Sequence, residues 1–466
     1  MLSLHTKVAP RLAALASCCF SLALACVTVS AQTGYGVVDL GMLPGGTSST
    51  GAGVNNNSQA VGSAFLPTLR RAFIYSNGTM SELLTAYHAA NGGFSSATAI
   101  NDAGQVVGGV SIAANNFTSR AFVLSGGNLT ILDRFGGSGG SGATAINSAG
   151  TVVGTSSSPD GFRAFVYANG VMTNLGVLSA GTDNTSQAWS VNDAGQVVGV
   201  ASTGTPFAVR AFLWKDGVMQ NLGVLPNASA SAATDINNSG QVVGYANIPS
   251  PFVQVPHAFL WTSANGMIDI GSLGGTGTIP PREMGTIPRS INDSGTIVGY
   301  STTADNRVHP FVYRDGVMID LMTLLPAGHC FTSVEVLAIN NDGTIVGSGT
   351  FANRQTRAIL LVPGSTAGGG QTCTGTPPPP PTPADVIAEM RALVANVDNA
   401  GVATSMDVKL RHLLNAMGDT DKAAACNHLA VFDKELGAQD GKHVAGGDAL
   451  VLRLKVGQLA GMIGCV

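Results

Sequence analysis

The stretch "INNSGQVVGYA", residues 236–246, is the most informative part of this sequence about its fold. Gly240 stands at the tight-turn position that favours a positive φ, where a side chain would be strained. The β-branched pair Val242-Val243 follows and suits a buried, pleated surface. The stretch therefore predicts a β-hairpin, and close variants bring its occurrences among the 466 residues to seven.

The seven copies follow a nearly fixed period. Their marker asparagines are spaced by 46, 46, 45, 45, 55 and 48 residues. A period in this range is typical of propeller blades or of solenoid repeats. The seven marker residues are Asn55, Asn101, Asn147, Asn192, Asn237, Asn292 and Asn340.

Each repeat holds four strand signals. The first ends in the marker asparagine, and the second, third and fourth read "QVVG", "RAF" and "VMxNLG". The last repeat lacks the fourth signal, and a seventh copy, "VVDLG" (37–41), precedes the first repeat. This predicts an all-β, seven-bladed β-propeller over residues 32–364, closed by its N-terminal strand, because closure protects exposed sheet edges. An open right-handed β-solenoid is the alternative. The six internal copies of the fourth signal lie at 79–84, 129–133, 171–176, 218–223, 266–271 and 317–321.

Composition changes after a proline-rich linker, residues 365–383. Such a linker is extended and fairly stiff. Beyond it, apolar residues recur at helical spacing from Ile387 to Val397 and again near 404–417, 420–436 and 446–463. Residues 384–466 are therefore predicted to form a small α-helical bundle.

The recurrent pattern "IN-x-x-G-QVVG … HAFLW … NLG" resembles the bacterial extracellular HAF repeat family over about residues 35–364. The tripeptide that names the family is His257-Ala258-Phe259 here, whereas most repeats carry Arg and the last carries Ile359. The resemblance implies secretion and a repeat fold but no settled activity. The C-terminal segment is similar to the helical FIMAH module, which implies attachment or interaction.

The first 31 residues are typical of a signal peptide. Lys7 and Arg11 precede an apolar stretch (12–29), and "VSA" (29–31) is a small-x-small cleavage site. We expect a secreted or periplasmic protein, and an uncleaved anchor or a lipidated Cys18 is the alternative. The formal net charge is −4, or −6 without Lys7 and Arg11, which does not favour nucleic-acid binding.

Four cysteines follow the predicted signal peptide, and disulfides are expected after export. Among the three possible pairings, Cys330–Cys373 with Cys426–Cys465 keeps each bond within one region. No cysteine or histidine spacing indicates a zinc site.

One basic or imidazole residue precedes the Ala-Phe signal in every repeat. Facing the central channel, these side chains would form an anion-binding ring. Their recurrence in every blade favours a structural role instead, in which each bonds to carbonyls of the next blade. The seven candidates are Arg71, Arg120, Arg163, Arg210, His257, His309 and Arg357.

The acids show no catalytic pattern, and no GxSxG, HExxH or P-loop is present. The turn aspartates are expected to bond through their side chains to the backbone of their own turns. The alternative is that they bind calcium, and no other cofactor is expected. His88 and His329 are expected at the surface of connecting loops. The turn aspartates are Asp102, Asp193, Asp216, Asp293, Asp315 and Asp342, and the remaining propeller acids considered for paired carboxylate chemistry are Glu82, Glu283, Glu335, Asp133, Asp160, Asp183, Asp235 and Asp305.

Variable loops on one rim, including 85–96 and 273–290, offer a binding surface next to the central funnel. The aromatic residues Trp189, Trp214, Trp261 and Tyr245 are expected to pack between blades rather than to form sugar platforms. We expect a monomeric, non-catalytic scaffold that binds a glycan, a cell-surface component or a protein. An extracellular polysaccharide hydrolase or lyase is the alternative, and two acids or an acid with histidine in the funnel would indicate it.

Overall fold

The computed structural model describes residues 34–113, 116–181, 184–204, 208–249, 254–275, 285–364, 383–395, 397, 399–418, 421–439, 442–444 and 446–465. The predicted signal peptide and the predicted linker up to residue 382 lie outside the described residues.

Seven four-stranded antiparallel sheets form the β region, one for each repeat. Blade 1 contains β2 (Ser48–Val54), β3 (Ala60–Phe65), β4 (Arg70–Ser76) and β5 (Thr79–Glu82), and blade 2 contains β6 (Ser95–Ile100), β7 (Val106–Ala113), β8 (Asn116–Ser125) and β9 (Asn128–Ile131). Blade 3 contains β10 (Ser141–Ile146), β11 (Val152–Ser158), β12 (Gly161–Ala168) and β13 (Val171–Asn174).

The remaining blades repeat this order along the chain. Blade 4 contains β14 (Ser186–Val191), β15 (Val197–Ser202), β16 (Val209–Lys215) and β17 (Val218–Asn221), and blade 5 contains β18 (Ala230–Ile236), β19 (Val242–Pro249), β20 (Gln254–Thr262) and β21 (Gly266–Asp269). Blade 6 contains β22 (Thr286–Ile291), β23 (Ile297–Thr302), β24 (Val308–Arg314) and β25 (Val317–Asp320), and blade 7 contains β26 (Phe331–Ile339), β27 (Ile345–Phe351), β28 (Thr356–Pro363) and β1 (Tyr35–Asp39).

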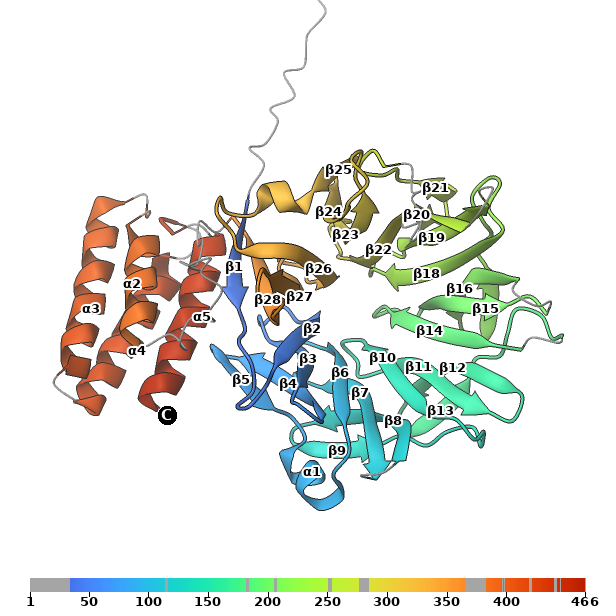
Figure 1. Ribbon diagram of the computed structural model, residues 1–466, viewed down its shortest axis with the longest axis horizontal. Helices are drawn as coiled ribbons and strands as arrows, with labels where there is room; N and C mark the ends of the chain where they lie inside the picture. Colours follow the sequence, from blue (N-terminus) through green and yellow to red (C-terminus); the bar gives the residue numbers. More distant parts are fainter. Residues whose placement is uncertain are drawn as a thin grey trace, which may run out of the picture. The chain divides into compact units, whose positions relative to one another are not determined.

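The N-terminal strand closes the ring, as predicted. Strand β1 pairs antiparallel with β28, and Val37 lies opposite Leu361. The first strands of the blades contact one another in sequence, and β26 contacts β2. These strands therefore surround the axis, and the fourth strands are outermost (Figure 1).

The antiparallel order divides the loops between the two ends of the propeller. The marker-asparagine turns and the hairpin turns before the fourth strands lie at one end. Loops between second and third strands and the connections between blades lie at the other end, the loop face. The connections include α1 (Thr85–Asn91) and the 3-10 helix η1 (Leu321–Leu324).

A close approach of backbone and aromatic ring explains the glycine of "QVVG". In blade 3, Gly154 lies opposite Phe165, which is fully buried. A Cβ on Gly154 would meet the carbonyl oxygen of Gly142 and come within 2.9 Å of the Phe165 ring. Glycine is therefore required where the first strand and the third-strand ring converge.

The C-terminal region is helical, as predicted, with α2 (Pro383–Val394), α3 (Ala400–Gly418), α4 (Lys422–Gln439) and α5 (Gly446–Ile463). Its core buries apolar side chains from all four helices, among them Met390, Leu410, Phe432 and Leu452. None of the described helices is long and apolar enough to span a membrane.

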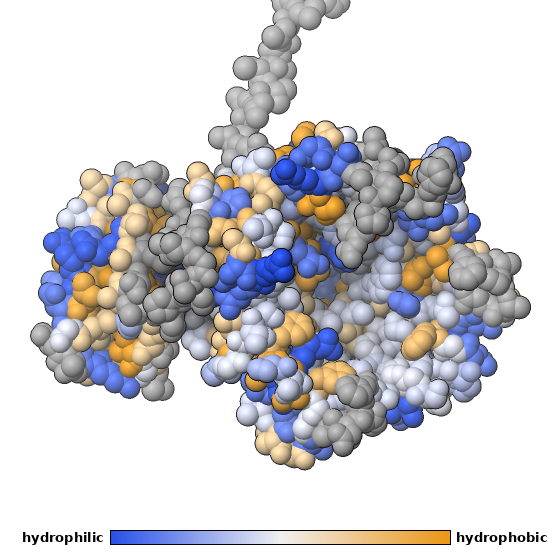
Figure 2. Space-filling view, viewed as in Figure 1, coloured by the Kyte–Doolittle hydropathy of each residue, from blue (hydrophilic) through white to orange (hydrophobic). Residues whose placement is uncertain are grey.

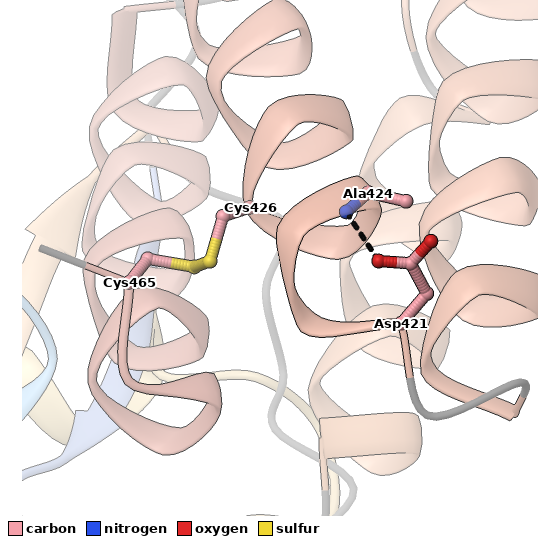
Figure 3. Close-up of a disulfide and its surroundings, with 4 residues drawn as sticks. All are labelled: Asp421, Ala424, Cys426 and Cys465. Atoms are coloured by element: carbon pink, nitrogen blue, oxygen red, sulfur yellow. Dashed lines mark hydrogen bonds between the residues drawn. A yellow bond between two sulfur atoms is a disulfide. The ribbon is translucent and has the colours of Figure 1, made fainter.

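The predicted bond Cys426–Cys465 joins α4 to the chain end after α5, with the two Cα atoms 5.5 Å apart (Figure 3). Nearby, the Asp421 carboxylate caps α4 by accepting a bond from the Ala424 amide at 2.9 Å. Cys330 is also disulfide-bonded. Its expected partner, Cys373, lies outside the described residues.

Candidate functional site

The marker asparagine of each repeat holds the ring together. In blade 3, Asn147 Oδ1 accepts a bond from the Thr151 amide at 2.9 Å, and Nδ2 donates to the carbonyl of Asn192 in the next blade. The seven blade-to-blade distances are all 3.0 Å, and the series closes from Asn340 to Asn55. The most regular feature of the sequence therefore serves the fold.

Three of the six turn aspartates differ from the prediction, which stays untested for Asp216, Asp315 and Asp342. Asp193 accepts bonds from the amide and hydroxyl of Ser148 in the preceding blade, at 3.0 and 2.7 Å. Asp102 and Asp293 also accept amide bonds from preceding blades. The marker asparagine satisfies the turn, so these carboxylates are free to bridge blades. Calcium binding at the turns stays a prediction.

The seven basic or imidazole residues lie on the third strands, near the loop face. The first and second strands separate them from the axis, so they do not form the channel ring. Arg71 and Arg210 donate to the connections leading to the next blade, at Gly93 and Ser229 (2.5 and 2.8 Å). These two bonds match the predicted structural role.

Four of the seven, Arg71 among them, also face an acid on the fourth strand of their own blade. The pairs are Arg71–Glu82 (3.2 Å), His257–Asp269 (3.0 Å), His309–Asp320 (2.7 Å) and Arg357–Asp39 (2.8 Å). Arg163 donates to carbonyls of its own strand region, and Arg120 Nη1 is buried with no hydrogen-bond partner among the described residues. A ligand-binding role for these seven stays a prediction.

His88 is not the surface residue that the sequence suggested. It lies in α1, is 7% exposed, and its Nδ1 is 2.6 Å from Glu82 Oε1. Burial lowers the pKa of His88, and the hydrogen bond with Glu82 opposes that shift. The short helix turns this side chain inward, which the expectation of a loop could not show. This acid–histidine pair and the two above involve fourth-strand acids, away from the funnel.

His329 is partly buried rather than fully exposed. Its ring stacks on Phe331, with centroids 6.1 Å apart, and its Nδ1 has no hydrogen-bond partner among the described residues. We assign it no ligand.

Every first strand contains a β-bulge three residues before the marker asparagine. A bulge leaves one residue without a partner on the next strand and re-aims its side chain. Because the first strands surround the axis, the bulged residues form a ring in the funnel wall. They are Ala52, Thr98, Thr144, Trp189, Thr234, Arg289 and Leu337.

Threonine at the bulge has a structural role. The Thr98 hydroxyl lies 3.1 Å from the Val107 carbonyl of its own blade and 2.9 Å from the Ala143 carbonyl of the next. Thr144 makes the equivalent contacts. Trp189 and Arg289 cannot reproduce these hydroxyl bonds. Blades 4 and 6 therefore depart from the repeat at a position where the repeat has a structural residue.

Trp189 lines a pocket of about 240 Å³ between blades 4 and 5. Tyr245, from the second strand of blade 5, lines the same pocket together with Gln187 and Asn247. The indole Nε1 of Trp189 donates to Gln187 Oε1 at 3.3 Å. The pocket thus offers one aromatic ring from each blade and several amide groups.

The aromatic residues therefore divide into two groups. Trp214 and Trp261 pack in hydrophobic clusters between blades, as predicted. Trp189 and Tyr245 line the pocket and join none of the hydrophobic clusters of the described residues, so the packing prediction is wrong for them.

A cation and a second tyrosine lie beside this pocket, in blade 6. The guanidinium carbon of Arg289 lies 5.2 Å from the centroid of the Tyr300 ring. Burial raises the pKa of the Tyr245 hydroxyl, Tyr300 adds to the rise and Arg289 opposes it. Burial also raises the pKa of Tyr300, with Glu335 of blade 7 contributing. The strands that carry the four residues are in contact, β19 with β22 and β23 with β26, so the residues lie in adjoining parts of blades 5, 6 and 7.

Figure 2 shows a hollow at the centre of the propeller. Large side chains occupy only part of the wall around it. We define the funnel cluster as Gln187, Trp189, Tyr245, Arg289, Tyr300 and Glu335. Blades 1 to 3 carry only Gly, Ala, Ser or Thr at the corresponding positions, namely Thr50, Ala52, Ser63, Ser96, Thr98, Gly109, Gly142, Thr144 and Thr155.

Asp235 is the other acid of the inner strands in this part of the ring. Its carboxylate accepts bonds from the hydroxyls of Ser190 and Ser290, at 2.6 and 2.7 Å, and from the amides of Ile236 and Ile291. Desolvation by the surrounding residues raises the pKa of the Asp235 carboxyl group, and these hydrogen bonds oppose the rise. Asp235 therefore connects three blades, and Glu335 is the carboxylate of the funnel cluster. Glu283 and Asp183 lie outside the described residues.

The sequence-based predictions did not include Gln187, Arg289 or Tyr300. A signal for them exists within the repeats. When the first strands are aligned on the marker asparagine, blades 4 and 6 carry Trp189 and Arg289 where the others carry Thr, Ala or Leu. Positions that vary inside a repeated strand are candidates for function, because the repeated residues already satisfy the fold.

Neither a known family profile nor a curated protein sequence is similar to this chain. Solved structures share the propeller fold at 9–10% identity. The β-propeller domain of the Trilobed protease from Pyrococcus furiosus has a TM-score of 0.42 and covers 68% of this chain and 94% of its own. TolB from Acinetobacter baumannii has a TM-score of 0.37 (63% and 76%), and the polysaccharide lyase Uly1 one of 0.38 (70% and 91%). Such likeness concerns the fold and carries no argument about function.

Proposed function

We propose that this chain is an exported, non-catalytic scaffold whose propeller binds a glycan in the pocket between blades 4 and 5. The observation that carries the proposal is the placement of Trp189 and Tyr245 around that pocket, with Trp189 at a bulge where three blades carry structural threonine. Aromatic rings pack against the apolar faces of sugars, and amides bond to their hydroxyls.

The size of the pocket supports a short epitope. Its volume of about 240 Å³ is below the roughly 300–1,000 Å³ of typical small-molecule sites. One sugar ring fits that space better than an enclosed oligosaccharide. The rest of a chain would extend along the open funnel.

The scaffold around the pocket is rigid. The ring of marker asparagines fixes each blade against the next, which lowers the entropic cost of ordering the site on binding. Export is supported by the Cys426–Cys465 disulfide, which suits an oxidising compartment. We assign the helical region the role of an attachment module, in keeping with its resemblance to the FIMAH module.

The test is a glycan array screened with the full chain, followed by calorimetry on each hit. Trp189→Thr installs the residue that blades 2, 3 and 5 carry at the same bulge, so the fold should tolerate it. We expect this variant to lose at least tenfold in affinity, because stacking on an aromatic ring is lost. Thr98→Ala, on the far half of the ring, is the matched control and should bind like the parent protein.

A parent protein that binds no glycan would contradict the proposal. So would a Trp189→Thr variant that binds as tightly as the parent. Release of reducing or unsaturated ends from a bound glycan would show an enzyme instead of a scaffold.

A further inference from the structure

We infer that the funnel cluster selects acidic glycans, with Arg289 binding the carboxylate or sulfate group of the sugar. This inference rests on the proposed glycan site and specifies its ligand class.

Arg289 is a cation that has no counter-ion among the residues that the structure describes. It is half-buried in the funnel wall, and no carboxylate of the described residues lies within 4.0 Å of its guanidinium. Its Nε is fully buried and has no hydrogen-bond partner among them. An unpaired, partly desolvated charge is costly to a fold. The other six blades avoid that cost with a neutral residue at the same bulge.

The packing of Arg289 against Tyr300 leaves the guanidinium able to bind an anion. The guanidinium lies over the Tyr300 ring, and a cation held against an aromatic face keeps its N–H edge available. That edge matches the paired oxygens of a carboxylate or a sulfate, which it binds through two parallel hydrogen bonds.

Tyr245 connects the cation to the sugar pocket. It lines the pocket with Trp189, and its strand β19 contacts β22 of the next blade, which carries Arg289. A sugar ring stacked on Trp189 would therefore present a substituent toward blade 6. The anionic group and the stacking ring belong to one ligand.

Glu335 allows a second, independent test, because removing its charge should change the affinity for acidic glycans in the opposite direction to removing Arg289. It is exposed on the first strand of blade 7 and lies near Tyr300, opposite in charge to Arg289. Its charge should weaken the binding of an anion nearby. Glu335→Gln should therefore raise affinity for acidic glycans, by roughly two- to fivefold.

The experiment uses the full chain and calorimetry with four probes in matched pairs. Polygalacturonate and its carboxyl-reduced form test a carboxylate, and carrageenan and its desulfated form test a sulfate. We expect the parent protein to prefer at least one charged probe to its neutral form by at least tenfold, a preference that falls with added salt. Arg289→Thr should abolish that preference without lowering the thermal midpoint, whereas Trp189→Thr should weaken both members of the pair.

The outcomes separate the two proposals. Binding to neutral probes, or to neutral glycans of the array, with no preference for the charged forms would overturn the acidic ligand and leave the glycan scaffold standing. An unchanged preference in Arg289→Thr would overturn the role of this residue. Failure to bind any probe or array glycan would overturn both.

Discussion

Ser58 shows how closely single residues follow the repeat. It occupies the turn position that is glycine in the other six marker turns, where φ lies between 72° and 82°. Ser58 itself has a φ of 58°, a left-handed conformation that costs an L-residue roughly 1–2 kcal/mol. Blade 1 therefore carries backbone strain at this turn, which the other six blades avoid by having glycine.

Replacing Ser58 with glycine should stabilise the propeller by about 1 kcal/mol, because glycine adopts this conformation without strain. Urea unfolding followed by tryptophan fluorescence reports on the propeller, since Trp189, Trp214 and Trp261 all lie in it. Gly150→Ser, the reverse substitution at the equivalent turn of blade 3, is the control and should destabilise the propeller. A loss of stability in Ser58→Gly would mean that the buried hydroxyl matters more than the backbone.

Among the elements, the connection between blades 1 and 2 differs most from its sequence interpretation. Residues 85–91 form helix α1, which buries His88 against Glu82 of β5. Glu82 also pairs with Arg71, so one carboxylate serves two partners. The connection is therefore an ordered part of the loop face.

The stability of this element should depend on pH. The pKa of His88 is lowered in the fold from 6.5, so the folded state binds its proton less tightly than the unfolded chain. The contribution of neutral His88 is complete above about pH 6.5 and is lost as the pH falls from there through the lower pKa of the folded state. We expect the free energy of unfolding to fall with acidification in this window, and to fall less steeply in His88→Gln.

Urea titrations at several pH values between 7 and 5 measure this difference. The two proteins share all other histidines, so the difference between their slopes isolates His88. Parallel slopes would contradict a buried neutral imidazole. His412→Gln, in the helical region, is a control that should leave the pH dependence of the propeller signal unchanged.

At the scale of the whole molecule, closure gives each of the seven blade interfaces the same marker-asparagine bond. The asparagine bond from Asn340 to Asn55 spans 285 residues of sequence, whereas the bond from Asn147 to Asn192 spans 45. In an open array the first of these bonds would not exist. In the ring both have the same length of 3.0 Å.

Asn340→Ala and Asn147→Ala should therefore destabilise the propeller by similar amounts, about 2 kcal/mol, since each removes two side-chain hydrogen bonds of the marker asparagine. Denaturant unfolding of the two variants side by side measures this. If Asn340→Ala costs nothing while Asn147→Ala is destabilised, the first and last blades are not joined in solution.

The architecture could be predicted from the amino-acid sequence, because every repeat carries the same local requirements. The positive-φ glycine, the glycine opposite the buried phenylalanine and the marker asparagine each follow from short-range geometry that recurs seven times. The missing fourth strand and its copy at residues 37–41 were enough to predict closure.

The site, in contrast, could be found only from the arrangement of the blades in space. Trp189, Tyr245 and Arg289 are separated by 44 to 100 residues, and no local pattern relates them. Closing the ring and bulging each first strand bring them to one wall of the funnel. A fold made of repeats can be predicted from one unit, but a site depends on how units that differ are placed around a common axis.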